Sequence, residues 1–246
     1  MKVIAHRGAS EIAPENTIPA FALAWEVGAD GVECDVRLTA DGEVVCIHDT
    51  ETERVGDRNL VVAARSYADL LDLDVGAWKG AEFQDVRIPL LSELLAMSPP
   101  GKQVFVEVKT GLEILSPLLD VFDASSIDLK AVTVIAFDLE VVRALKQQRP
   151  DLCMYWLIDV ESDEAGHSLS HIKKVIEQAN VLGCEGLGLC SHPSLDDRMV
   201  ESFFEAGLEL NIWTVDDPAD ARRYASLGVT SISSNCPQEM RDAITG

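Results

Sequence analysis

Short apolar runs alternate with amphipathic segments along almost the whole chain. The runs that favour strands cover residues 2–6, 31–49 (two strands separated by an Asp-Gly turn), 103–109, 132–136, 152–158, 185–190, 208–215 and 229–233. Between them, apolar positions recur at helical spacing over 18–27, 89–97, 112–123, 138–148, 168–181, 195–206, 217–226 and 238–244. Strands that alternate with helices of about 10 to 15 residues are typical of right-handed βαβ units and a parallel sheet.

Eight such units in succession favour an α/β fold closed into a (β/α)8 TIM barrel. The length of 246 residues is close to the roughly 250 typical of one such barrel. A doubly wound open sheet is the alternative, but no Gly-x-Gly-x-x-Gly motif follows the first strand. The longest break is a polar, acidic stretch after Asp49, in which 66–73 favours a short helix. We therefore expect one domain over 1–246, with a small insertion at 49–88.

The composition narrows the possible partners and the location. A formal net charge of −22 opposes binding to nucleic acid or an anionic membrane surface, because either would need a cationic face. No apolar run approaches the roughly 20 residues of a membrane span, and no export signal is visible at the N-terminus. The six cysteines are scattered and form no Cys-x-x-Cys pair, so we expect reduced thiols in the cytoplasm.

Three carboxylates occupy equivalent positions in two of the expected strands. Successive side chains of a strand point to opposite faces, so Glu33 and Asp35 share one face, and Glu107 and Lys109 share another. An isolated Glu-x-Asp is ordinarily a solvated strand edge, but acids held together repel one another unless a cation, a shared proton or solvent relieves them. Oxygen ligands suit Mg²⁺ or Ca²⁺, with Mn²⁺ also open, and the lack of clustered Cys or His ligands argues against structural zinc.

The carboxyl ends of barrel strands converge on one face, which is where catalysis takes place in such folds. Those ends would bring His6, Arg7 and His48 toward the carboxylates. An imidazole with an ordinary pKa of about 6.5 takes and gives protons at neutral pH, so the two histidines are the candidate base and acid. Arg7 and Lys109 are suited to hold a phosphate, and Trp213 at the same ends is open to either a pocket wall or ordinary core.

These residues resemble the motifs of the glycerophosphodiester phosphodiesterase family, in family order and over nearly the whole chain. The matching pieces are His6-Arg7-Gly8, Pro14-Glu15-Asn16-Thr17, Glu33-x-Asp35-Val36, Asp41-Gly42 with His48-Asp49, Leu73-Asp74 with Gly76 and Trp78, Ile88-Pro89, Glu107-x-Lys109 and Trp213-Thr214-Val215. The His-Arg-Gly, Glu-x-Asp and His-Asp group at these spacings is the most specific part of the match.

The resemblance implies a TIM barrel in which one divalent cation is bound by Glu33, Asp35 and Glu107. It also implies that His6 and His48 act as general acid and base. The implied reaction is hydrolysis of a glycerophosphodiester to glycerol 3-phosphate and an alcohol, and a glycerol hydroxyl that attacks phosphorus first, giving a cyclic intermediate, is a further hypothesis.

The remaining implications concern the substrate. Arg7 and Lys109 would bind the phosphoryl oxygens, Trp213 would form an apolar wall beside the glycerol, and residues 49–88 would lie over the active-site face. Two rim segments depart from the family pattern. Asp216 stands where Asn is frequent, and Ser233-Ser234-Asn235-Cys236-Pro237 stands where Ile-Thr-Asp-x-Pro is frequent. The departures leave the glycerol contacts and the preferred alcohol open.

Two other functions remain open on the sequence alone. One is a related barrel phosphodiesterase acting on lysophospholipids or sphingolipid-type diesters, against which the net charge and the lack of an apolar anchor both weigh. The other is a catalytically silent barrel that binds a phosphorylated metabolite, although no expected histidine or metal carboxylate is missing. We expect a small-molecule substrate, no nucleic acid, no stable membrane association, and a monomer or homodimer. His167 and His171 share a helical spacing, but without a carboxylate partner we favour a solvated helix over a metal site.

Overall fold

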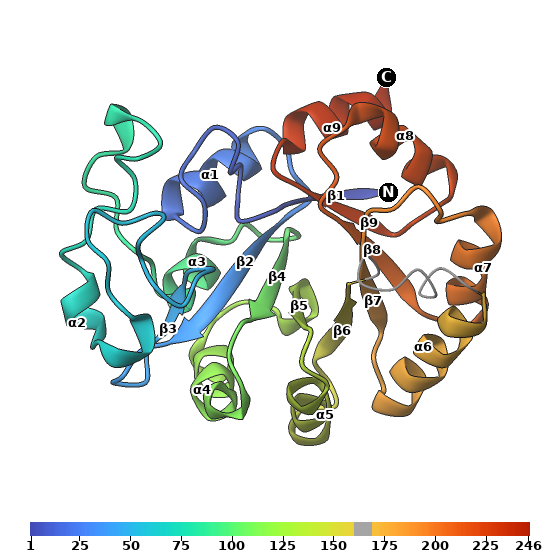
Figure 1. The fold of residues 1–246 in the computed structure, drawn as a ribbon, viewed down its shortest axis with the longest axis horizontal. Coiled ribbons are helices and arrows are strands. Elements are labelled where there is room, and N and C mark those ends of the chain that lie inside the picture. The colour runs from blue at the N-terminus through green and yellow to red at the C-terminus, as the bar shows by residue number, and fades with distance from the viewer. Residues whose placement is uncertain (160–168) are drawn as a thin grey trace.

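The predicted barrel is confirmed by the computed structural model, which describes residues 1–159 and 169–246, with 169–171 described through their backbone alone. Eight parallel strands close around a common interior in the order β1 (Lys2–Ala5), β2 (Gly31–Leu38), β4 (Gln103–Val108), β5 (Val132–Ala136), β6 (Cys153–Ile158), β7 (Gly186–Cys190), β8 (Glu209–Trp213) and β9 (Ser231–Ser234). The barrel closes because β9 pairs with β1 (Figure 1). A short strand, β3 (Val44–Cys46), lies antiparallel to β2 after the expected Asp-Gly turn.

The helices cover the outside of the barrel and begin where capping residues predict. They are α1 (Ile18–Glu26), α3 (Leu91–Met97), α4 (Leu115–Ala124), α5 (Leu139–Gln148), α6 (Leu169–Leu182), α7 (Asp197–Glu205), α8 (Pro218–Ser226) and α9 (Pro237–Thr245). Thr17, Asp138, Asp196 and Asp217 each accept a backbone N–H from the first turn that follows them. The predicted helix positions are confirmed to within three residues at each described end. His167 and the side chain of His171 lie outside the described residues.

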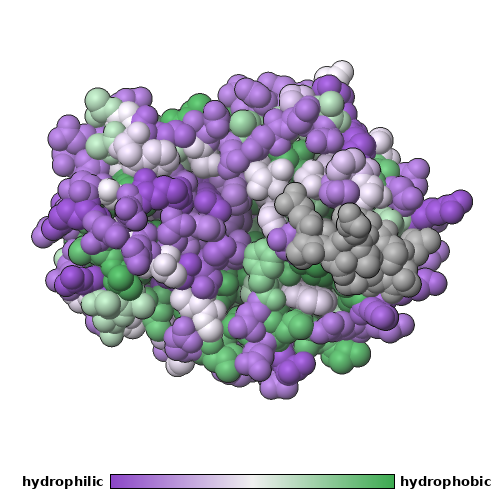
Figure 2. All heavy atoms as spheres, viewed as in Figure 1, coloured by the Kyte–Doolittle hydropathy of each residue, from purple (hydrophilic) through white to green (hydrophobic). Residues whose placement is uncertain are grey.

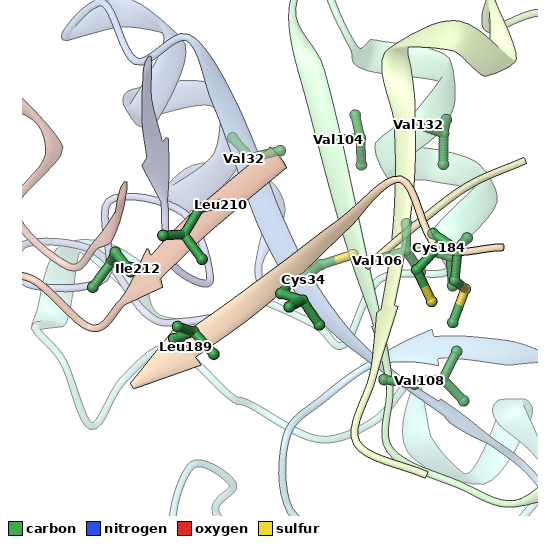
Figure 3. Packing of buried hydrophobic residues seen from close by; sticks show 14 of the residues in the cluster. Val32, Cys34, Val104, Val106, Val108, Val132, Cys184, Leu189, Leu210 and Ile212 are labelled. Carbon is green, nitrogen blue, oxygen red and sulfur yellow. The ribbon is translucent and has the colours of Figure 1, made fainter. Parts of the chain in front are cut away.

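Apolar side chains form two layers, one on each side of the strands. The outer layer fills the space between strands and helices, where valines and a cysteine of β2 and β4 join Phe21 of α1 and Leu118 of α4. Figure 3 shows part of this layer, including Val32 and Cys34. The inner layer lies inside the barrel and consists of Ile4, Phe105, Ile135, Tyr155 and Leu157. Because alternate residues face inward, Glu33, Asp35 and Glu107 point into the barrel above this inner layer.

The segment 49–88 carries its own small core beside the barrel. It contains η1 (Val62–Ala64), α2 (Tyr67–Leu70) and η2 (Ala81–Phe83), and α2 is the short helix expected near 66–73. Ser66 and Asp69 form a capping box at the start of α2. Two side chains join the segment to the loop after β1. Lys79 Nζ donates to the Ser10 carbonyl at 2.7 Å, and Arg54 pairs with Glu15 at 2.6 Å. Figure 1 shows the segment in teal beside α1 and β3.

Two single-turn helices, η3 (Leu112–Ile114) and η4 (Leu129–Ala131), complete the architecture. No helix in the described part of the chain is both long and apolar enough to cross a membrane. None of the six cysteines, all of which lie within the described ranges, forms a disulfide.

Candidate active site

A cavity of about 230 Å³ opens at the carboxyl ends of the barrel strands. Its lining comprises His6, Arg7, Glu33, His48, Glu107, Lys109, Ile135, Phe137, Leu157, Asn211, Trp213, Thr214 and Ser233. Seven of the eight residues expected from the sequence are in this list, and the eighth, Asp35, lies buried against Arg7 and Lys109. The face shown in Figure 2 carries hydrophilic side chains over the segment 49–88, to the left of centre, and paler and apolar ones at and below the centre.

The three carboxylates converge at the base of this cavity. One oxygen from each of Glu33, Asp35 and Glu107 lies within 4.8 Å of the others, and their exposed fractions are 1%, 0% and 7%. Two of the buried oxygens, Glu33 Oε1 and Asp35 Oδ1, have no hydrogen-bond partner. A buried acceptor left unsatisfied is costly, and hard divalent cations take carboxylate oxygens as ligands. The donor set therefore fits a single ion such as Mg²⁺ or Ca²⁺.

The positively charged side chains of Arg7 and Lys109 lie close to the carboxylates and influence how negative charge is distributed among them. Burial raises the pKa of Asp35, but Arg7 Nε at 3.0 Å and Lys109 Nζ at 3.6 Å outweigh it and hold that pKa below its usual range. Burial, together with the neighbouring carboxylates, raises the pKa of Glu33 well above its ordinary value. Burial and Asp35 also raise the pKa of Glu107 to about 7, against the opposing effect of Lys109. Arg7 and Lys109 thus bring the pKa of Asp35 below its usual range but not those of Glu33 and Glu107, and a further cation would favour the ionised forms of these two.

A sharp turn after β1 places Arg7 beside the acidic cluster. Arg7 (φ 58°) and Gly8 (φ 83°) both adopt the left-handed conformation directly after the strand. A Cβ at Gly8 would lie 2.6 Å from the carbonyl carbon of Ala20, so only glycine fits against α1 here. The turn lets the backbone N–H of Arg7 donate to Glu33 Oε2 at 2.9 Å. The His-Arg-Gly motif thus binds one carboxylate through its backbone and another through its side chain.

Two supporting residues were missed by the sequence reasoning. Asn16, 3% exposed, donates to Asp35 Oδ2 at 2.7 Å, and its own Oδ1 accepts the Asp35 backbone N–H at 3.0 Å. Arg37 Nε donates to the His48 carbonyl at 2.7 Å, which fixes the backbone that carries the histidine. The motif Pro-Glu-Asn-Thr contained the signal for Asn16, although it gave no indication of the partner. Nothing in the local pattern around Arg37 indicated its role.

The two histidines face the cavity with different partners on Nδ1. His6 Nδ1 lies 2.9 Å from Asn235 Oδ1, and its Nε2 lies 4.0 Å from Glu33 Oε2. His48 Nδ1 lies 2.7 Å from Asp49 Oδ1, and Arg54 Nε donates to the other oxygen of Asp49 at 2.7 Å. Burial lowers the pKa of the His6 imidazole, and Arg7 acts in the same direction. Burial also lowers the pKa of His48, in this case against the effect of Asp35.

The opposite side of the cavity is apolar and comes from β5, β6 and β8. Trp213 was expected there from the sequence, whereas Ile135, Phe137 and Leu157 were not. Phe137 and Trp213 meet edge to face, with ring centroids 5.6 Å apart. A ring edge carries partial positive charge and a ring face partial negative charge, so this contact fixes both side chains. The arrangement forms a hydrophobic wall that adjoins the carboxylates, since Ile135 is in register with Glu107 on the neighbouring strand.

A larger hollow of about 520 Å³ lies on the outside of the barrel near the β2–β3 turn, α3 and α4. Its lining, taken from the described residues, includes Glu43 and Asp120 but no histidine, arginine or lysine. It has no imidazole that could transfer protons near neutral pH and no cation that could bind a phosphate, which favours the smaller cavity as the site of the chemistry.

Comparison with known proteins places these features in a family. Residues 6–239 match the model of the "Glycerophosphoryl diester phosphodiesterase family". A glycerophosphodiester phosphodiesterase of Caldanaerobacter subterraneus subsp. tengcongensis is 32% identical over 247 residues, covering 97% of this chain and 95% of that protein. Among solved structures, a phosphodiesterase of Oleispira antarctica in complex with the product sn-glycerol-3-phosphate superposes with a TM-score of 0.89. It is 27% identical and covers 100% of this chain and 97% of its own.

Proposed function

The chain belongs to the glycerophosphoryl diester phosphodiesterase family, and on that premise we propose that it hydrolyses small glycerophosphodiesters with the aid of one bound divalent cation. It is a phosphoric diester hydrolase, as its relatives are. The substrates we assign are glycerophosphocholine and glycerophosphoethanolamine, and the products are glycerol 3-phosphate and the free alcohol. The observation that carries this proposal is a cavity lined by Glu33, Glu107, two histidines, an arginine and a lysine, with the third carboxylate, Asp35, buried directly behind them.

Glu33, Asp35 and Glu107 hold the cation, which is Mg²⁺ or Ca²⁺. When bound, it polarises the phosphoryl group and neutralises negative charge that develops on the oxygens. The two buried carboxylate oxygens without hydrogen bonds support this assignment, because coordination would satisfy both. Asn16, Arg7 and Lys109 keep the carboxylates in place through the bonds already described.

His6 and His48 carry the protons of the reaction. One removes a proton from the attacking water molecule, whose oxygen forms the new P–O bond, and the other gives a proton to the oxygen of the departing alcohol as its P–O bond breaks. Both rings line the cavity, and both have a hydrogen-bonded Nδ1 that fixes the ring and leaves Nε2 for the reaction. Lys109 and the free donors of Arg7 bind the phosphoryl oxygens, where their positive charge attracts an anion into a protein of net charge −22.

The apolar wall consists of Ile135, Phe137, Leu157 and Trp213. It contacts the CH and CH₂ groups of the glycerol. A volume of about 230 Å³ is below the roughly 300 to 1,000 Å³ of sites for drug-sized ligands. This supports a small diester over a lipid that carries an acyl chain. Six cysteines without a disulfide support a reducing compartment, and we assign the enzyme to the cytoplasm.

The first experiment measures the release of glycerol 3-phosphate from glycerophosphocholine and from glycerophosphoethanolamine. Each assay is run with EDTA and then with Mg²⁺, Ca²⁺ or Mn²⁺ added back. We expect activity that EDTA abolishes and a cation restores. Glu33→Gln should lower kcat by about 10²- to 10³-fold, because it removes charge where the cation binds.

Glu201→Gln is the matched control, since Glu201 is an exposed carboxylate on α7. We expect this variant to match the parent in every assay. Release of product that survives EDTA and Glu33→Gln would contradict the metal assignment. A lack of turnover on both substrates with every cation, beside turnover of a lysophospholipid, would move the substrate class to lipids.

A further inference from the structure

A hydrogen-bonded chain behind His6 links the loops after β8 and β9. It contains Asp216 and Asn235, which are two of the positions at which the rim departs from the family pattern. Asn235 is half-buried and Asp216 is exposed, and neither lines the cavity. The chain of contacts runs from Asp216 to Asn235 and from Asn235 to the ring of His6.

Asp216 is held by three donors from the loop that follows β9. Its Oδ1 accepts from Ser234 Oγ at 2.9 Å and from the Asn235 backbone N–H at 2.8 Å. Its Oδ2 accepts from Asn235 Nδ2 at 2.7 Å. An ionised carboxylate only accepts hydrogen bonds, so it must face the NH₂ end of the Asn235 amide. The charge of Asp216 thereby fixes which way this amide points.

The fixed amide in turn determines the state of His6. With Nδ2 directed to Asp216, Asn235 presents Oδ1 to His6 Nδ1 at 2.9 Å. Ser10 Oγ lies 2.8 Å from this oxygen and 2.8 Å from the His6 carbonyl, and its single hydrogen is shared between them. An amide oxygen cannot donate, so Nδ1 must carry the hydrogen in a neutral ring. The lone pair then lies on Nε2, which is the nitrogen on the side of Glu33.

We propose that the hydrogen-bonded pair of Asp216 and Asn235 positions His6. Asp216 acts through Asn235 to hold the tautomer of His6 that carries its hydrogen on Nδ1. The pattern that this chain resembles frequently has Asn at the first position and Asp at the second, whereas here the two types are interchanged. In this chain, Asn235→Asp alone would place two carboxylates in contact, and Asp216→Asn alone would place two amides in contact. Both changes together keep one acceptor-only group and one amide across the 2.7 Å contact.

This inference rests on the proposed function, because the assigned work of His6 is proton transfer in that reaction. The test uses Asp216→Asn, Asn235→Asp and the double exchange of both. Asp217→Asn is the matched control, since the neighbouring Asp217 only caps α8 and Asn caps equally well. Each protein is assayed with its cation bound for kcat, KM and thermal unfolding. The ¹⁵N resonances of the His6 ring, identified with His6→Gln, report the tautomer.

We expect Asp216→Asn to lower kcat by about two- to tenfold, because the amide of Asn235 is then free to turn. The His6 resonances should move toward a mixture of tautomers, while KM and the unfolding temperature stay near the parent values. Asn235→Asp should cost about 10- to 100-fold in kcat, because two carboxylates then face each other. The double exchange should recover most of that loss, and Asp217→Asn should change nothing.

Unchanged kcat and unchanged His6 resonances in Asp216→Asn would overturn the inference. A double exchange no more active than Asn235→Asp would also overturn it, as would a loss of kcat that only follows the unfolding temperature. If Asn235→Asp does not fold, Asp216→Asn decides the question alone. A parent enzyme with no turnover would contradict the proposed function instead, and the ring resonances would still test the pair.

Discussion

The two sides of the active-site cavity are built on opposite physical principles. The side formed by β1, β2 and β4 carries three buried carboxylates and two cations, with buried oxygens that lack hydrogen bonds. The side formed by β5, β6 and β8 carries apolar groups, of which Ile135 and Leu157 are buried and Phe137 and Trp213 are partly exposed. We refer to them as the charged side and the apolar side.

The difference indicates which side of the cavity carries the reactive groups and which side contributes to the stability of the fold. On the charged side, burial and like charges work against the carboxylates, so the arrangement is unfavourable until a cation joins it. On the apolar side, the burial of Ile135 and Leu157 is favourable, because it removes hydrocarbon from water. Substitutions should therefore affect activity most on the charged side and stability most on the apolar side.

Asp35→Asn should produce the largest effect, on the charged side. Asp35 is fully buried, is paired with Arg7 and Lys109, and is one of the three carboxylates that we propose as cation ligands. Asparagine keeps the shape but loses the charge, so we expect kcat to fall by about 10²- to 10³-fold. Steady-state kinetics with saturating cation would measure this loss.

Asp138→Asn is the matched control on the other side, since Asp138 caps α5 beside the apolar strands and Asn caps a helix equally well. We expect it to retain the parent kcat. If Asp35→Asn and Asp138→Asn gave similar activities, the assignment of chemistry to the charged side would be wrong.

The charged side could be predicted from the sequence because its signal is local. Glu33 with Asp35, and Glu107 with Lys109, are two residues apart on a strand, so the alternation of a strand alone places each pair on one face. The apolar side could not be predicted in the same way. Leu157 at the end of a barrel strand has the same pattern as any core leucine, and only the closed barrel shows that it borders a cavity.

The supporting hydrogen bonds also lay beyond sequence reasoning. Asn16 bonds to Asp35 across 19 positions, and Asn235 lies against His6 across 229 positions. Such contacts depend on how the barrel closes, and no periodicity in the chain indicates them. The barrel itself was predictable because alternating strands and helices with short connections leave few topologies.

Leu157→Ala should produce the next largest effect, in this case on stability. Leu157 is 3% exposed and packs with Ile4, Phe105, Ile135 and Tyr155 inside the barrel. We expect a loss of about 2 kcal/mol in the free energy of unfolding, at the lower end for a buried leucine because the side chain borders a cavity. Denaturant titration would measure it, and the loss of kcat should stay smaller than that of Asp35→Asn.

Leu112→Ala provides the control for this measurement, because Leu112 is a leucine with 48% of its surface exposed. Its free energy of unfolding should change by less than about 0.5 kcal/mol. A loss equal to that of Leu157→Ala would show that the inner layer is not a principal source of stability.

Glu33→Gln should have the smallest effect on stability, but the sign of that effect is the most informative, because stability should rise although activity is lost. Burial, Asp35 and Glu107 all raise the pKa of Glu33, which means that its negative charge is unfavourable in the folded protein. Glutamine keeps an oxygen for the Arg7 backbone N–H and adds an amide that can donate to a neighbouring carboxylate. In EDTA we expect a gain of about 1 kcal/mol, or about 2 to 4 °C in the unfolding temperature.

The order of stability between the parent and Glu33→Gln should reverse when a cation is supplied. A ligand that binds only the folded state stabilises it in proportion to its affinity, and the parent should gain more from the cation than Glu33→Gln does. Thermal unfolding in EDTA and in excess Mg²⁺ or Ca²⁺ measures both halves of the prediction. If the variant were less stable than the parent already in EDTA, the negative charge of Glu33 would not destabilise the folded protein. The division of chemistry and stability between the two sides would then fail.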